Sequence, residues 1–337
     1  MSTLTVLDVG HGSCSVISSE GKTVVLDAAN RTHLLCYLES KGIRQIDLIV
    51  ISHTDLDHVG GLLNILSSPD LVVKRLVINP DGQKKSKIWG DIRALVDGVV
   101  ARGELDLVMS VVGGKKYEWA DITDGLSLEV ISPSTAMAMS GPGLRLPEGQ
   151  NVITGNSASI VLRVVFNNIP VVLVTADMDS ISLSEIQRCE IPVKSDFLIF
   201  PHHGGLPGNA DPVKFTQELI AMVEPKSVIF SNGRGLHGTP KAEIIKIIKE
   251  NVPSPYIACT QLSLNCCAKP MVRDDFKPVN YSAGAMDDAF CAGTIEIDLI
   301  NRVSNEIALE AHISFISGLP SSLCGQRKLI AVTNLND

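Results

Sequence analysis

Long uninterrupted hydrophobic runs are missing from this 337-residue sequence. A membrane-spanning helix needs roughly 18 consecutive apolar residues, and the richest stretch, residues 160–175, is broken by polar residues and by Pro170. The N-terminus also lacks a basic segment followed by an apolar one, and residues 4–7 instead have the pattern of a first strand. The sequence therefore predicts a cytoplasmic protein without a membrane partner, and it leaves the oligomeric state open.

An excess of positive charge is also lacking, because the formal net charge at pH 7 is −8. Such a balance argues against broad non-specific binding of nucleic acid. Residues 72–116 are an exception, since nine Lys or Arg residues there outnumber five Asp or Glu residues by four. This basic segment either guides an anionic substrate or is a solvated helix face and loop.

The eight cysteines do not have the pattern of a disulfide framework in a small secreted domain. Three of them lie in apolar surroundings and are predicted core thiols: Cys14, Cys36 and Cys189. Four more fall within 33 residues: Cys259, Cys266, Cys267 and Cys291. These four either hold a structural zinc ion or are buried free thiols, because their spacing lacks the usual Cys-x2-Cys pair.

The most informative segment present begins at His53 and reads His-Thr-Asp-Leu-Asp-His-Val-Gly-Gly. Four potential metal ligands fall within six residues of it: His53, Asp55, Asp57 and His58. They follow an apolar run, residues 47–52, that is typical of a buried strand. Imidazole and carboxylate groups together favour zinc, manganese or iron over calcium. The pattern predicts a metal site on the loop after the strand, whereas a lone His or Asp would indicate only a solvated loop.

Two further apolar strands are also followed by candidate ligands. Asp177 follows residues 171–175, where its carboxylate could bridge two cations or begin a helix. His202 and His203 follow residues 196–200.

The order of expected elements favours a mixed α/β (α+β) fold. Strands lie close together near the N-terminus and later alternate with helices, so two facing sheets with helices outside, αββα, would bury runs this apolar. We expect one domain over residues 1–258, which carries the candidate metal ligands, and a Cys-containing extension over residues 259–337. Period-two patterns at 294–300 and 306–312 predict a β-hairpin within that extension, which gives the fold a C-terminal β appendage.

Four segments together resemble the metallo-β-lactamase fold hydrolases, and in particular the ComEC-type branch, the soluble hydrolase part of bacterial DNA-uptake channel proteins. The segment from His53 resembles the His-x-His-x-Asp-His signature, with Asp55 at the second His. Residues 8–13, Asp-Val-Gly-His-Gly-Ser, resemble the opening Asp-x-Gly-Gln-Gly-Asp motif. Residues 175–177 resemble Thr-Gly-Asp, and residues 201–205 resemble the His-His-Gly-Ser motif. The resemblance covers residues 3–250 and implies a four-layer αββα metallo-β-lactamase sandwich.

The resemblance implies a binuclear centre with two divalent ions, zinc or manganese. Six side chains are the expected metal ligands: His53, Asp55, Asp57, His58, Asp177 and His203. His53 and Asp55 are assigned to one ion. Asp57, His58 and His203 are assigned to the other, and Asp177 is expected to bridge both. Which of His202 and His203 ligates metal and which faces substrate stays open. Asn156 and Ser157 stand where many members carry another metal-binding His.

Other residues are expected around these ligands. By resemblance Asp27 braces a ligand histidine and so fixes its tautomer, and Asp8 is expected to do similar work. His237 either resembles a histidine that lies late in the sequence of this fold or is a polar loop residue. His11 is interpreted as a structural residue that borders the site. Asp57, His202 and His237 are the residues assigned to catalysis.

The expected chemistry is hydrolysis by a metal-bound hydroxide, since metal coordination lowers the pKa of water toward about 7. The favoured function is a phosphodiesterase or nuclease that acts on nucleic acid or a nucleotide. This substrate class is implied by the resemblance to the ComEC-type branch. One alternative is a lactone, thioester or lactam hydrolase on the same metals. A second alternative is a catalytically weak sensor or partner-binding protein.

Overall fold

The computed structural model describes residues 1–325 apart from residues 30, 147–151, 272, 274–277 and 279. Its larger sheet contains, in spatial order, β16 (Val303–Ser304), β15 (Ile295–Asp298), β1 (Ser2–Val6), β2 (Ser15–Ser19), β3 (Lys22–Leu26), β5 (Leu48–Ile51), β7 (Arg75–Ile78) and β8 (Asp106–Val108). The smaller sheet contains β14 (Tyr256–Cys259), β13 (Ser227–Phe230), β12 (Phe197–Ile199), β11 (Ile169–Val174), β10 (Val161–Phe166) and β9 (Leu126–Ser132). A separate pair joins β4 (Gln45–Ile46) to β6 (Val72–Val73).

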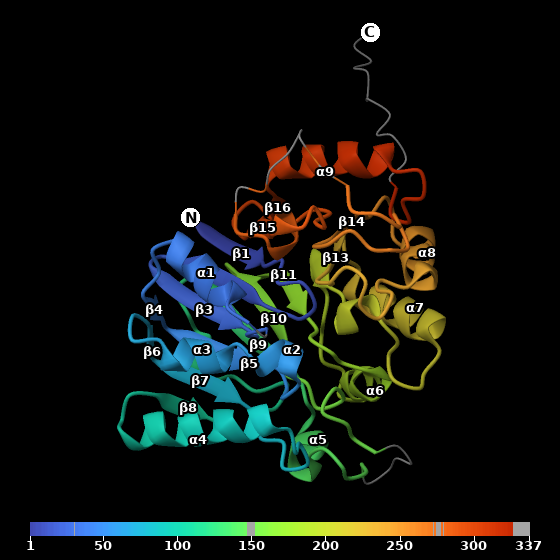
Figure 1. Cartoon of the computed structure of the whole chain (residues 1–337). Coiled ribbons are helices and arrows are strands. Elements are labelled where there is room, and N and C mark those ends of the chain that lie inside the picture. Colours follow the sequence, from blue (N-terminus) through green and yellow to red (C-terminus); the bar gives the residue numbers. More distant parts are fainter. Residues whose placement is uncertain (30, 147–151, 272, 274–277, 279, 326–337) are drawn as a thin grey trace.

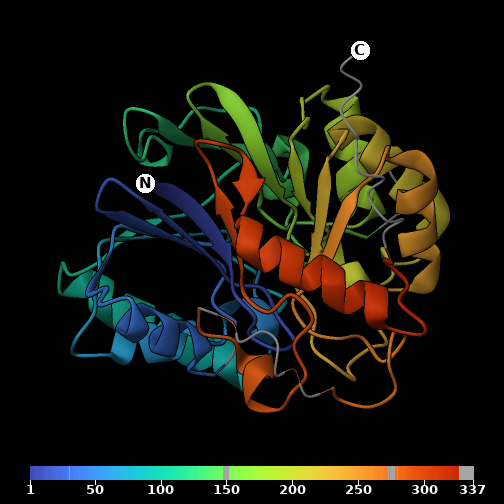
Figure 2. The same ribbon diagram turned by 90° about the horizontal axis from the view of Figure 1, so that it is seen from above.

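Successive residues of a strand point to opposite faces of its sheet. Both faces of the two sheets are apolar, so one face of each sheet packs against the other sheet. In β3, Val24 and Leu26 point into a core shared with the other sheet, whereas Val25 packs on the outside. In β11, Val172 and Val174 enter the same central core, and Leu173 faces outward. Figures 1 and 2 show the resulting sandwich with helices on its outer faces. The predicted αββα fold is confirmed.

Each outer face is covered by amphipathic helices. The larger sheet is covered by α1 (His33–Ser40), α3 (Leu62–Ser67) and α4 (Lys87–Ala101). The smaller sheet is covered by α6 (Ser180–Arg188), α7 (Pro212–Val223) and α8 (Ala242–Asn251). Two short helices, α2 (Leu56–Val59) and α5 (Thr135–Ser140), lie in loops. Within the described residues, no helix is both long and apolar enough to cross a membrane.

Parallel strands bring several loops to one edge of the sandwich. In the larger sheet β5 runs parallel to β3 and β7. In the smaller sheet β12 runs parallel to β11 and β13. Because the carboxyl ends of parallel strands share an edge, the loops after β3, β5, β11, β12 and β13 can meet there.

The C-terminal region differs from the sequence-based expectation. The first predicted strand of the hairpin is confirmed as β15, which pairs antiparallel with β1 and with β16. The prediction of a strand at 306–312 is wrong, because these residues begin the helix α9 (Glu306–Gly318). The side chain of Asn305 caps this helix by accepting from the backbone N–H of Ala308 at 3.2 Å. Good helix formers follow, and a seven-residue alternation does not outweigh them. The division after residue 258 stays a prediction.

Candidate metal centre

The loop after β5 is held by close backbone packing. Gly61 donates its N–H to the Ala28 carbonyl at 2.8 Å, and a Cβ on Gly61 would lie 2.4 Å from the Ala29 oxygen. Gly12 packs as closely, since a Cβ there would lie 2.5 Å from the Asp57 carbonyl oxygen. Side chains larger than hydrogen would therefore separate the loops that carry the two N-terminal motifs.

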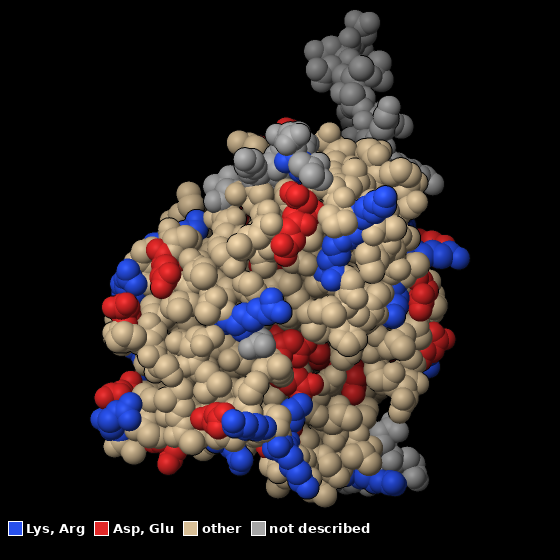
Figure 3. Space-filling model, viewed as in Figure 1, with Lys and Arg blue, Asp and Glu red and all other residues tan. Residues whose placement is uncertain are grey.

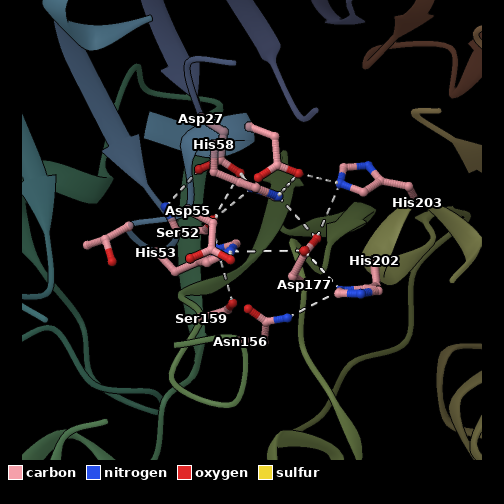
Figure 4. A network of polar contacts seen from close by, with 12 residues as sticks. Asp27, Ser52, His53, Asp55, His58, Asn156, Ser159, Asp177, His202 and His203 are labelled. Atoms are coloured by element: carbon pink, nitrogen blue, oxygen red, sulfur yellow. Dashed lines mark hydrogen bonds and ion pairs between the residues drawn. The ribbon is translucent and has the colours of Figure 1, made fainter. Parts of the chain in front are cut away.

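Four side chains from three loops converge at this edge: Asp57, His58, Asp177 and His203. Their ligand atoms all lie within 4.8 Å of one another. His58 Nε2 lies 3.1 Å from Asp177 Oδ1, and His203 Nε2 lies 3.3 Å from Asp57 Oδ2. Within the described residues, His58 Nε2, His203 Nε2 and Asp177 Oδ1 are buried atoms without a hydrogen bond. Buried polar atoms are normally satisfied, so this set fits a divalent cation (Figure 4).

A second group of donors adjoins the first. His53 Nε2 is also buried without a hydrogen bond among the described residues. It lies 3.9 Å from Asp55 Oδ2 and 4.0 Å from Asp177 Oδ2. Asp177 thus faces His53 with one carboxylate oxygen and His58 with the other (Figure 4). This second group offers fewer protein ligands than the first. Nearby, the amide nitrogen of Asn156 lies 3.4 Å from His202 Nδ1.

Asp27 orients one of the imidazoles. His58 Nδ1 donates to Asp27 Oδ2 at 2.7 Å, which leaves Nε2 as the nitrogen that faces the cluster. Asp27 also accepts from the backbone N–H of Ser52 at 2.7 Å and from its hydroxyl at 2.9 Å. Asp27 has a φ of +59°, a conformation that Asp tolerates better than most residues.

Asp8 is arranged differently from Asp27. Its carboxylate accepts from the backbone N–H groups of Gly10 and Gly284, from Gln261 and from Ser282, at 2.5 to 3.2 Å. Asp8 therefore ties the first motif to the C-terminal region rather than to a ligand histidine.

Three further histidines surround the cluster. His202 Nδ1 lies 2.9 Å from Asp177 Oδ2, and its side chain is partly exposed. His203 is the histidine that enters the cluster, and its Nδ1 donates to the Ser231 carbonyl at 2.7 Å. His237 lies beside His11, with ring centroids 4.8 Å apart. His11 Nε2 lies 3.3 Å from Asp57 Oδ2. The interpretation of His11 as a structural residue did not predict this contact.

Neighbouring histidines lower the pKa values of two carboxylates of the cluster. Burial alone would raise the pKa of Asp177, but His58 and His203 outweigh burial and hold that pKa well below its usual value. Burial likewise opposes ionisation of Asp57, and the neighbouring His11 and His203 nevertheless lower its pKa. Both carboxylates are therefore ionised at neutral pH and can accept a cation.

The cluster opens into two adjoining cavities. The larger, of about 1300 Å³, is lined by His11, Asp57, His203, His237 and Lys241 among others. The smaller, of about 640 Å³, is lined by Asp55, Lys84, Asn156 and His202 among others. Asp177 lines both cavities. Figure 3 shows acidic side chains gathered in the hollow of this face, with Lys and Arg around them.

The basic segment 72–116 is partly neutralised by ion pairs. Lys74 pairs with Asp47 at 2.9 Å, Arg75 pairs with Asp106 at 2.5 Å, and Arg102 pairs with Glu104 at 2.8 Å. Lys84 pairs with Asp55 at the site itself. The local sequence contains no signal for that contact, because it depends on how the loop after β7 folds back over the loop after β5.

The cysteines give a mixed outcome. Cys14 is buried as predicted, but Cys36 is only partly buried and Cys189 is exposed, so those two are not core thiols. The four cysteines considered for a zinc site form no disulfide: Cys259, Cys266, Cys267 and Cys291. Burial raises the pKa of Cys259 and of Cys291, and both lie in an apolar cluster with Cys324. The structural zinc ion stays a prediction.

Known proteins resemble this chain in sequence. Residues 7–77 match the family model described as the metallo-beta-lactamase superfamily. ComE operon protein 3 of Bacillus subtilis (strain 168) is 25% identical over 219 residues, which are 65% of this chain and 24% of that protein. Competence protein ComA of Neisseria gonorrhoeae is 25% identical over 206 residues, 60% of this chain and 23% of that protein. The chain thus spans about a quarter of the length of these curated relatives.

Solved structures resemble it more distantly. The metallo hydrolase Igni18 from Ignicoccus hospitalis is 17% identical with a TM-score of 0.43, covering 76% of this chain and 94% of that one. Tm1679, a metal-dependent hydrolase of the beta-lactamase superfamily, is 15% identical with a TM-score of 0.47, covering 77% and 96%. The sequence matches confirm the predicted resemblance to the metallo-β-lactamase superfamily of metal-dependent hydrolases and, within it, to the ComEC-type branch.

Proposed function

Since the chain has a metallo-β-lactamase fold and a candidate metal site of Asp and His side chains, we propose that it is a cytoplasmic, metal-dependent phosphodiesterase or nuclease. The observation that carries this proposal is the convergence of Asp57, His58, Asp177 and His203, whose ligand atoms lie within 4.8 Å of one another. This cluster opens to a cavity large enough for a nucleotide-sized group.

Each ligand has a separate part in the proposal. Asp57, His58 and His203 would hold one divalent ion, zinc or manganese, and Asp177 would be shared with a second position formed by His53 and Asp55. When bound, such ions lower the pKa of water and offset negative charge on a phosphoryl oxygen.

The surrounding side chains bind and orient the substrate. His202 lies on the cavity side of Asp177, which fixes its Nδ1, so the opposite ring nitrogen can donate a proton to a leaving oxygen. His237 lines the larger cavity and can hydrogen-bond to a substrate oxygen. Asp27 keeps the proton of His58 on Nδ1, away from the ion.

Two features support a phosphodiester rather than an acyl substrate. The ComEC-type resemblance points to nucleic acid, and Lys84 and Lys241 line the two cavities, where they can attract an anion. Channel function is outside the proposal, because the similarity covers about a quarter of each relative.

The test is a substrate panel for the metal-loaded protein. We expect hydrolysis of bis(p-nitrophenyl) phosphate, and of single-stranded DNA, RNA or a nucleotide, with more turnover in manganese than without metal. The variant Asp177→Asn is the control for contaminating nucleases. Cleavage of lactones or thioesters with every phosphodiester left intact would establish the acyl-hydrolase alternative. Metal binding without any turnover would favour the sensor alternative.

A further inference from the structure

Lys84 lies where the second metal position is formed. Its ammonium group donates to Asp55 Oδ1, while the other oxygen of that carboxylate, Oδ2, lies 3.9 Å from His53 Nε2. Asp55 therefore divides its two oxygens between a histidine of the second position and a fixed positive charge. The pair is only partly exposed, at 31% for Lys84 and 35% for Asp55.

The loop that carries Lys84 is fixed by contacts of its own. Asp81 Oδ1 accepts from the backbone N–H groups of Gln83 at 2.9 Å and Lys84 at 3.1 Å. Asp81 Oδ2 accepts from the hydroxyl of Thr54 at 3.2 Å, next to Asp55 in the chain. The indole of Trp89 donates to the Asp81 carbonyl at 3.1 Å. The buried Asp81 thus holds Lys84 over the metal-binding loop by hydrogen bonds that involve no metal ligand.

The two candidate metal positions differ in the number of protein ligands they can keep. The first position has two imidazoles and two carboxylates within 4.8 Å of one another. The second has His53, the shared Asp177 and the oxygen of Asp55 that does not contact Lys84, which is Oδ2. A divalent ion beside Asp55 would also meet the positive charge of Lys84, and like charges at such short range repel strongly in a partly buried site.

We propose that Lys84 competes with the second divalent ion for Asp55. The resting centre then holds one ion tightly, and the Lys84 ammonium supplies the other positive charge that faces the substrate anion. This inference rests on the metal centre of the proposed function, and it assigns to one side chain the control of how many ions that centre holds.

The experiment measures metal binding directly in the 337-residue chain. Manganese is titrated into metal-free protein, and bound ions are counted by equilibrium dialysis and by electron paramagnetic resonance, which distinguishes single ions from coupled pairs. We expect one tight ion in the wild type. In Lys84→Met the second ion should bind at least roughly tenfold more tightly, with the first unchanged, because the competing charge is gone.

Two matched variants complete the design. Lys85→Met removes an exposed neighbouring charge and should bind metal like the wild type. Lys84→Arg keeps the charge and should restore one-ion behaviour. Two equally tight ions in the wild type, or an unchanged second ion in Lys84→Met, would overturn the competition. Because the readout is stoichiometry, it is independent of whether any phosphodiester is cleaved, and failure of the proposed function would be seen separately.

Discussion

Replacing Asp27 by Asn is the sharpest test of how the metal ligands are oriented. The substitution keeps the size of the side chain, and Asn tolerates the φ of +59° at this position. One Asn oxygen can still accept from the Ser52 N–H, which now donates at 2.7 Å. The amide nitrogen then faces His58 Nδ1, which now donates to the carboxylate at 2.7 Å.

Two donors cannot face each other, so His58 must lose this hydrogen bond or move its proton to Nε2. A proton on Nε2 would point at the metal position, and only a deprotonated nitrogen can ligate. Loss of one buried charge-assisted hydrogen bond costs about 1.5–3 kcal/mol, which corresponds to roughly a 10- to 100-fold lower metal affinity.

The assay is competition for zinc between the protein and a chromophoric chelator, with unfolding by urea measured in parallel. Asp8→Asn is the matched control, because Asp8 is also a buried carboxylate but its partners are Gly10, Gln261, Ser282 and Gly284. We expect the control to lose stability and to keep its metal affinity. The reasoning is refuted if folded Asp27→Asn binds zinc within about twofold of the wild type.

Three other predictions concern different parts of the chain. Asp177→Asn should lower metal content and hydrolysis together, by about 100-fold or more in affinity, as metal analysis after desalting would show; wild-type metal content would contradict the shared role. If Cys259 helps to hold zinc, Cys259→Ser should lose one ion and stability, whereas unchanged stoichiometry favours free thiols. Burial and Arg273 lower the pKa of His312 from 6.5 to about 3. The unfolded chain therefore takes up a proton first on acidification, and between about pH 7 and pH 5.5 the wild type should lose about 1 kcal/mol more unfolding free energy than His312→Gln; equal losses would contradict this.

The sequence predicts the local parts of this site well and the long-range parts poorly. The loops that carry Asp57, Asp177 and His203 each follow a strongly apolar strand, and parallel strands bring such loops to one edge. The approach of His11 to Asp57 and the pairing of Lys84 with Asp55 depend on how separate loops pack. Nothing in the local pattern of either residue specifies that packing.

The error at residues 306–312 has a different cause. Seven residues of alternating polarity satisfy both a strand and the start of an amphipathic helix, and propensity and capping then decide between them. Asn305 at the N-cap and the helix formers after it were the deciding signals. By contrast β15 was predicted correctly, because its residues Ile295 and Ile297 alternate with polar ones over the whole strand.

The position of β15 against β1 has a consequence for how the chain is made. β1 lies between β2 and β15, so one edge of this N-terminal strand stays unpaired until nearly 300 residues have been synthesised. An unpaired edge strand invites pairing with another chain. A protein shortened after residue 258 would keep that edge exposed permanently and would also lose the Ser282 and Gly284 donors of Asp8. The C-terminal region thus covers an edge of the first strand of the sheet.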